Sequence, residues 1–156
     1  MQDELNQESF SDNKRYKVLL VDDEDFNHEI LDLSLNKTEF SLVYAKSVEA
    51  AMRIIASDPP DIIITDAMMP GESGFSLIEK VRAHTDMART PIILWTSLEQ
   101  PDGSVMDASR KADFTVSKPF YLSRILETLE KAKQLAEYRK ATEKGNDPDD
   151  TVKFVM

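Results

Sequence analysis

The sequence predicts an α/β fold, a doubly wound parallel sheet of five strands with helices on both faces. Two observations support this prediction. Five short stretches rich in Val, Ile and Leu recur along the chain, and apolar residues at helical spacing follow each of them. Strands and helices that alternate in this way form parallel sheets with right-handed crossovers. Such strands are apolar throughout, because helices cover both faces of the sheet.

The five predicted strands are short apolar runs. The first is a continuous run of Val and Leu, and the third contains three consecutive isoleucines after Asp58-Pro59-Pro60. Runs of this length between breakers are typical of buried strands. We expect strands at Lys17 to Val21, Phe40 to Ala45, Asp61 to Thr65, Pro91 to Thr96 and Phe114 to Ser117.

Five helices are predicted between and after these strands. In the first, the residues expected to be buried are Phe26, Ile30, Leu31, Leu33 and Leu35. Ser47 is the expected N-cap of the second helix, because its hydroxyl can accept a hydrogen bond from the first turn. The later helices are expected at Val48 to Ile55, Gly74 to His84, Asp102 to Ala112 and Tyr121 to Thr142.

Composition restricts the class of protein. The 156 residues suit one domain, and the net charge of −10 argues against direct binding of nucleic acid, which favours basic surfaces. The chain has no cysteine, and therefore neither disulfides nor thiolate zinc sites. No apolar run approaches the roughly 18 residues that a membrane span needs, and the acidic N-terminus does not resemble a signal peptide. We therefore expect a cytoplasmic protein without membrane insertion.

The chain is expected to divide into three regions. Residues 1–14 are polar and acidic and are expected to form a flexible extension. Residues 15–142 are expected to form the folded domain, including a last helix longer than the fold requires. Residues 143–156 are acidic and low in hydrophobicity at their start, and are expected to be a disordered tail.

Polar and charged residues stand at the ends of four predicted strands. Asp22 and Asp23 follow the first strand, and Asp66 follows the third. Thr96 ends the fourth strand and Lys118 follows the fifth. Because the carboxyl ends of parallel strands share one edge of a sheet, we expect these side chains to lie close together. Three carboxylates, a hydroxyl and a lysine, without a glycine-rich phosphate loop, fit Mg²⁺ and phosphoryl chemistry, with one carboxylate as the nucleophile.

These strand ends carry a resemblance to the receiver domain of two-component response regulators. The matching segments are Val21-Asp22-Asp23-Glu24, Asp66-Ala67-Met68-Met69-Pro70 with Gly74, Thr96-Ser97, and Lys118-Pro119-Phe120. Their successive anchor residues are 44, 30 and 22 residues apart, as in the family, and the resemblance covers about residues 15 to 135. It implies a flavodoxin-like (βα)5 fold with the strand order 2-1-3-4-5.

The resemblance also implies residue roles. Asp66 would accept a phosphoryl group from the phosphohistidine of a sensor histidine kinase or a histidine phosphotransfer protein. Mg²⁺ would be held directly by Asp23 and Asp66, by Asp22 through a water molecule, and by the backbone carbonyl of Met68. Lys118 would pair with a phosphoryl oxygen.

Further positions would modulate the site. The resemblance implies that the hydroxyl of Thr96 moves onto the phosphoryl group and that Pro119 follows a cis peptide bond. Ser97 stands where a smaller residue is common, and Thr115 stands where an aromatic residue usually couples to the hydroxyl. Met68 and Leu98 are expected to flank the path of the hydrolytic water, and we hypothesise that they slow hydrolysis.

Three other residues are expected to have no role in the chemistry. Trp95 precedes Thr96 and is therefore expected to point to the opposite face, into the core. His28 and His84 are expected on exposed helix surfaces.

The resemblance implies a signalling module that catalyses only its own phosphotransfer and dephosphorylation. Phosphorylation would switch binding to a downstream protein through the face formed by Asp102 to Ala112, Phe114 to Ser117 and Tyr121 to Thr142, which could also support a homodimer. We expect a stand-alone receiver. The alternatives are a fragment of a larger regulator with a C-terminal effector and a pseudo-receiver that binds partners without phosphorylation. A phosphatase of the haloacid dehalogenase type would need a second Asp where this chain has Met68.

Overall fold

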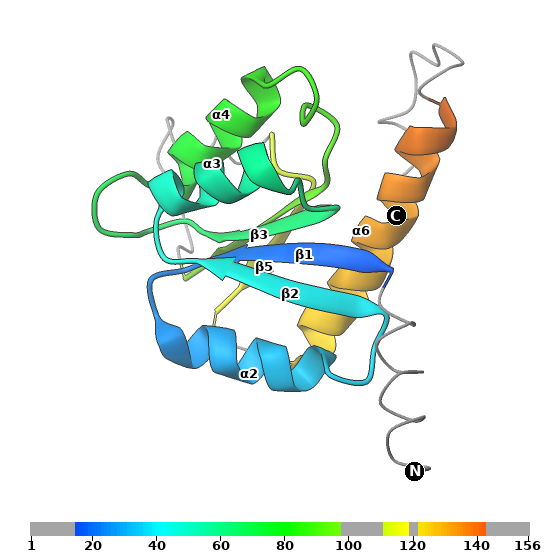
Figure 1. Cartoon of the computed structure of the whole chain (residues 1–156). Helices are drawn as coiled ribbons and strands as arrows, with labels where there is room; N and C mark the ends of the chain where they lie inside the picture. Colours follow the sequence, from blue (N-terminus) through cyan, green and yellow to red (C-terminus); the bar gives the residue numbers. More distant parts are fainter. Residues whose placement is uncertain (1–14, 98–110, 119–121, 143–156) are drawn as a thin grey trace.

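The computed structural model describes residues 15–97, 111–118 and 122–142 (Figure 1). Five parallel strands form one sheet in the order β2-β1-β3-β4-β5, which confirms the predicted fold class and strand order. The strands are β1 (Tyr16–Val21), β2 (Phe40–Ala45), β3 (Ile62–Asp66), β4 (Ile92–Thr96) and β5 (Phe114–Ser117). Their bounds differ from the predicted ones by at most one residue.

Four helices lie in the described part of the chain: α2 (Asp25–Leu35), α3 (Val48–Ser57), α4 (Gly74–Ala83) and α6 (Leu122–Thr142). Apart from Lys111 and Ala112, the helix predicted at Asp102 to Ala112 lies outside the described residues. No helix in the described part is long and apolar enough to cross a membrane.

The helices cover both faces of the sheet (Figure 1). Along β1, Leu19 and Val21 pack into the core beneath α3 and α4. Val18 and Leu20 pack into the core beneath α2 and α6. This alternation explains why the strand is apolar at every position, since successive side chains enter opposite cores.

Helix α2 presents a different face to the core than the sequence predicts. The expected core residues Phe26 and Leu33 are 66% and 76% exposed. The buried residues are instead Asn27, His28, Leu31 and Leu35, and the prediction that His28 is exposed is therefore wrong. The physical reason lies before the helix, where the turn after β1 offers hydrogen-bond partners to Asn27 and His28. These hydrogen bonds offset much of the cost of burying the two side chains, although the second ring nitrogen of His28, Nδ1, is buried without a partner among the described residues.

The connection from β3 to α4 folds back closely on Asp66. A Cβ atom on Gly74 would lie 1.9 Å from the backbone oxygen of Asp66, so that only glycine fits there. Gly74 N donates to the carbonyl of Ala67 at 3.1 Å. Gly71 adopts φ 84°, a left-handed conformation that glycine tolerates best. Ser73 then caps α4 by accepting from Ser76 N. These contacts fix the loop that carries Met68.

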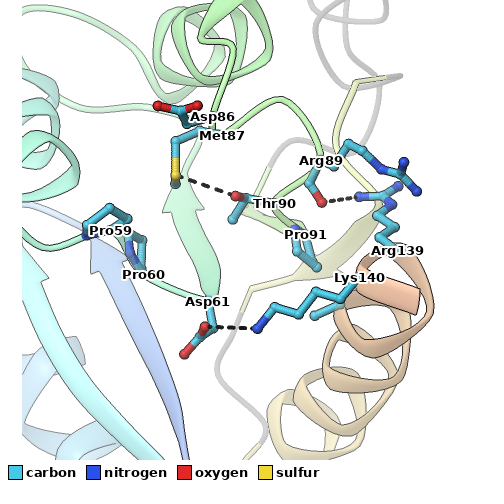
Figure 2. Close-up of a pocket in the computed structure, with 11 residues that line it drawn as sticks. Pro59, Pro60, Asp61, Asp86, Met87, Arg89, Thr90, Pro91, Arg139 and Lys140 are labelled. Atoms are coloured by element: carbon cyan, nitrogen blue, oxygen red, sulfur yellow. Dashed lines mark hydrogen bonds and ion pairs between the residues drawn. The ribbon is translucent and has the colours of Figure 1, made fainter. Parts of the chain in front are cut away.

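A second group of charges lies at the amino edge of the sheet. Asp113, just before β5, accepts hydrogen bonds from Arg82 at 2.8 Å, from Arg139 at 2.6 Å and from Ile92 N at 2.9 Å. Arg139 also donates to the carbonyl of Arg89 at 3.0 Å (Figure 2). These bonds join α4, β4, β5 and α6.

A cavity of about 250 Å³ lies beside this network (Figure 2). Its walls combine three prolines and Met87 with charged groups, among them Lys140, which lies 3.8 Å from Asp61. None of the predicted site residues lines this cavity. Asp61 and Pro91 in its lining directly precede β3 and β4, whereas the predicted site residues lie at the other ends of the strands. The predicted site and this cavity therefore lie at opposite edges of the sheet.

Candidate functional site

The three predicted carboxylates meet at the carboxyl edge of the sheet. Asp22 and Asp23 follow β1, Asp66 ends β3, and these two strands are paired with Val21 opposite Thr65. One oxygen from each carboxylate lies within 4.8 Å of the others. Asp22 is fully buried and Asp66 is 7% exposed, whereas Asp23 is exposed. The sequence-based expectation that these acids gather is thus matched by their geometry.

Asp22 is held by the first turn of α2. Its two carboxylate oxygens accept hydrogen bonds from Glu24 N and from the side-chain amide of Asn27, each at 2.9 Å. The Nε2 atom of His28 lies 2.7 Å from the backbone oxygen of Asp22. The sequence does not identify Asn27 or His28 as site residues. Asn27 lies four residues before Leu31 and His28 lies three residues before it, so both are on the inward face of α2. This helical spacing is the signal that could have identified them.

Asp66 uses both of its carboxylate oxygens. Its Oδ1 accepts from Met68 N at 3.2 Å, and its Oδ2 accepts from the Lys118 ammonium at 3.0 Å. Lys118 also lies 3.7 Å from Asp22. Burial alone would lower the pKa of Lys118, but the hydrogen bond and charge of Asp66, with the charges of Asp22 and Glu24, raise it above its usual value. The lysine is therefore positively charged in the neutral pH range.

Trp95 underlies this lysine. It is 1% exposed and belongs to the core beneath α2 and α6, as the sequence predicts. The sequence does not predict that its ring centroid lies 5.1 Å from the Lys118 ammonium, within the range of a cation–π interaction.

The predicted switch residues occupy different environments. Thr96 is buried at the end of β4, and its carbonyl accepts from Lys118 N at 2.9 Å. Ser97 and Thr115 are exposed. Phe114 packs partly into the core beneath α2 and α6, on the side of the strand opposite Thr115.

Of the remaining predicted site residues, one lies in the β3–α4 loop and two lie outside the residues that the structure describes. The side chain of Met68 is 60% exposed, and the direct structural contact of this residue is its N–H to Asp66. Leu98 and Pro119 lie outside the described residues, so the expected cis peptide bond stays a prediction.

The donor set of the acidic cluster fits Mg²⁺. This ion binds hard oxygen ligands about 2.0–2.1 Å away in octahedral geometry, which places adjacent ligand oxygens roughly 3 Å apart and opposite ones roughly 4 Å apart. The three carboxylates lie within 4.8 Å of one another, close to that arrangement. Asp23 forms no hydrogen bond or ion pair with any other described residue, so its oxygens are available for a ligand. Among the described residues, Lys118 is the one cation paired with these acids.

Comparison with known proteins identifies the family. The model of the response regulator receiver domain matches residues 18–130. One curated relative, named "Probable transcriptional regulator ycf27" from Guillardia theta, is 34% identical over 104 residues. This match covers 67% of the chain but only 40% of the relative, so the chain spans less than half the length of that protein.

Solved structures agree with the family match. The chemotaxis response regulator CheY4 of Vibrio cholerae is 26% identical with a TM-score of 0.68, over 75% of this chain and 98% of that one. The signal receiver domain of a signal transduction histidine kinase from Syntrophus aciditrophicus is also 26% identical with a TM-score of 0.68, over 79% of this chain and 91% of that one. Receiver domains serve phosphorylation-driven signalling and generally bind Mg²⁺ in an acidic pocket. The chain belongs to the receiver domain family of two-component response regulators.

Proposed function

We propose that Asp66 accepts a phosphoryl group from the phosphohistidine of a sensor histidine kinase or a histidine phosphotransfer protein. The observation that supports this most directly is the pairing of the Asp66 carboxylate with Lys118 at 3.0 Å, inside a group of three carboxylates. Carboxylates this close repel one another, and a bound cation offsets that cost. Receiver domains typically work in the cytoplasm, and we propose the same location for this one.

The proposed transfer forms one bond and breaks one. An Asp66 carboxylate oxygen attacks the phosphorus atom, and the P–N bond to the donor imidazole breaks. The electron pair of that bond stays on the imidazole nitrogen, and the imidazole leaves in its neutral form, with its proton on the other ring nitrogen. An acyl phosphate remains on Asp66. Lys118 then balances charge on the phosphoryl oxygens, and its position beside Asp66 Oδ2 places it where that charge develops.

Mg²⁺ is the proposed cofactor. Asp22, Asp23, Asp66 and the backbone carbonyl of Met68 would hold it. When bound, it supplies positive charge that offsets the negative charge of the carboxylates and the phosphoryl group. The tight turn at Gly74 contributes by keeping the Met68 loop against the end of β3.

The proposed output is a change in protein binding. Thr96 reports the phosphoryl group, and the equilibrium between two conformations of the face that contains β5 and α6 then shifts. That face is the proposed contact for the downstream protein, and for a homodimer if one forms. In this proposal the protein catalyses only its own phosphotransfer and hydrolysis.

The test is phosphorylation by acetyl phosphate with Mg²⁺, followed by mass spectrometry. We expect the wild type to gain one phosphoryl group that is labile to hydroxylamine, as acyl phosphates are. Asp66→Asn should gain none. Asp61→Asn, which lies just before the opposite end of the same strand, is the matched control and should behave like the wild type. A wild type that stays unmodified, or an Asp66→Asn variant that is modified equally, would contradict the proposal.

Two other functions have specific support. Thr115 is exposed and not aromatic, which favours a pseudo-receiver that binds its partner without phosphorylation. The relative named as a transcriptional regulator is much longer than this chain, which favours a receiver that controls an attached effector. Binding of the downstream partner with equal affinity before and after phosphorylation would support the first alternative. The length of the full gene decides the second.

A further inference from the structure

Trp95 lies immediately beside the proposed phosphoacceptor. It is the register partner of Asp66 across the β3–β4 pair, and its carbonyl accepts from Ala67 N at 3.2 Å. The Lys118 ammonium is 5.1 Å from the centroid of its ring. One lysine therefore contacts the carboxylate of Asp66 and the aromatic face of its strand neighbour together.

The alternation of the strands accounts for this arrangement. Trp95 belongs to the core beneath α2 and α6, as do Leu20, Ile64 and Val116. Side chains two residues apart on a strand share a face of the sheet. The residues two positions after these three are Asp22, Asp66 and Lys118. Trp95 therefore lies on the face from which two of the carboxylates and the lysine emerge.

We propose that Trp95 is a positioning residue for the phosphoryl site, and that its indole face holds the Lys118 ammonium in place beside Asp66. The face of an aromatic ring carries negative electrostatic potential and attracts a cation within about 6 Å. A lysine side chain is flexible and its ammonium is strongly hydrated, so that it does not hold one position unaided. Burial of the ring excludes water from one side of the ammonium, and the carboxylates of Asp66 and Asp22 bind it from the other.

The role of Trp95 in phosphorylation rests on the proposed function, since Lys118 is the proposed partner of the phosphoryl oxygens. The contact between Trp95 and Lys118 does not depend on the proposed function. Two measurements can therefore separate the contact between Trp95 and Lys118 from its consequence for phosphorylation.

The simpler explanation is that Trp95 only fills space in the core. Fluorinated tryptophans distinguish the two explanations, because fluorine withdraws electron density from the ring face and changes the ring volume little. The chain contains one tryptophan, so replacement of all tryptophan with the mono-, di- and trifluoro forms alters Trp95 alone. The same molecule provides a control, because the Lys133 ammonium lies 5.7 Å from the ring centroid of Tyr16, which this labelling leaves unchanged.

The first measurement is the pKa of the Lys118 and Lys133 ammonium groups, followed by NMR in the free protein. A weaker attraction by the ring disfavours the charged form of lysine. We expect the pKa of Lys118 to fall stepwise with the number of fluorines, by about one unit in total. The pKa of Lys133 should not change. A constant pKa for Lys118, or an equal fall in both lysines, would overturn the inference.

The second measurement is the affinity for beryllofluoride with Mg²⁺, which mimics the phosphoryl group. We expect the affinity to weaken in the same order as the pKa falls, by up to about tenfold in total. Trp95→Phe, which keeps a smaller ring face, should bind beryllofluoride more tightly than Trp95→Leu. Equal affinity across the fluorine series would overturn the role in phosphorylation. If the unlabelled wild type does not bind beryllofluoride at all, the proposed function fails, while the pKa series still tests the contact between Trp95 and Lys118.

Discussion

The two charged clusters, which lie at opposite edges of the sheet, differ in their balance of positive and negative groups. At the amino edge, one carboxylate, Asp113, is bound by two arginines, and both of its oxygens are used. At the carboxyl edge, three carboxylates lie together, and among the described residues one lysine pairs with two of them, Asp22 and Asp66. In the first cluster both oxygens of the acid are paired by the chain itself and positive charge is in excess, whereas the second carries an excess of negative charge.

The difference shows what each cluster contributes. Asp113 connects the starts of β4 and β5 with α4 and α6, and such a network stabilises the fold when all of its groups are paired. The acids at the carboxyl edge repel one another, which costs stability and leaves the site ready for a cation. Groups held in an unfavourable environment are a feature of functional sites. The cavity in Figure 2 adjoins the cluster around Asp113.

Neutralising one carboxylate in each cluster should give the largest contrast. We expect Asp113→Asn to reduce the free energy of unfolding by about 3–5 kcal/mol, because two arginines that are largely withdrawn from water lose their counter-charge. Asp23→Asn, the same chemical change at the carboxyl edge, should raise the thermal midpoint because it relieves repulsion. Denaturant unfolding and thermal melts without Mg²⁺ provide the measurement. Equal losses in the two variants would show that the edges do not differ in this way.

The carboxyl edge also depends on the close backbone contact between Gly74 and Asp66. We expect Gly74→Ala to reduce the free energy of unfolding by about 1–3 kcal/mol, because the new Cβ atom collides with the Asp66 carbonyl. Mg²⁺ affinity should fall with it, since the clash displaces Asp66.

Gly71→Ala is the matched control for this prediction. It strains a left-handed residue but meets no atom within 4 Å, so Mg²⁺ affinity should be kept. Calorimetric titration with Mg²⁺ distinguishes the two, and unchanged affinity in Gly74→Ala would contradict the prediction.

Removal of a neutral residue that orients an acid should affect binding more than stability. We expect Asn27→Ala to weaken Mg²⁺ binding roughly 10- to 100-fold, as loss of a group that orients a ligand typically does. The reason is that the Asn27 amide holds one oxygen of Asp22. Asn36→Ala, at the exposed end of the same helix, should bind Mg²⁺ like the wild type. A comparable loss in both variants would indicate a general effect on α2.

The smallest predicted effect is a change in the free energy of unfolding as pH rises into the alkaline range. The pKa of Lys118 is raised in the folded protein, so the folded state holds its proton more tightly than the unfolded state does. The stabilisation is therefore fully present below the unfolded pKa of about 10.4 and is lost as pH rises through the folded pKa.

The difference in unfolding free energy between the wild type and Lys118→Met should accordingly shrink above about pH 10. Arginine side chains lose their proton only far above pH 10, so Arg82→Met should show no matching change. A constant difference for Lys118→Met would contradict the prediction.

The sheet and the acidic cluster could be predicted from the sequence because both follow from strand ends. Asp22, Asp66 and Lys118 each stand directly at such an end, and parallel strands bring these ends to one edge. Their charge and spacing are properties of the chain that need no knowledge of packing. The same holds for the continuous apolar runs, which indicate a sheet covered on both faces.

What the sequence did not predict depends on contacts between distant residues. In α2, Phe26, Ile30 and Leu33 form as good a helical stripe as His28, Leu31 and Leu35, and hydrophobicity alone favours the wrong one. The hydrogen bonds of Asn27 and His28 to Asp22 settle the choice. The contact between Lys118 and Trp95 likewise joins two strands whose side chains share a face, a relation that needs the register of the sheet.

The position of Trp95 also gives the protein a built-in optical probe. A single indole, shielded from water and lying between the phosphoacceptor strand and the lysine, emits light whose colour and intensity depend on its immediate surroundings. Movement of the ammonium off the ring would change that emission without any attached dye. Events at Asp66 can therefore be followed in real time in the unlabelled wild-type chain, at concentrations too low for NMR.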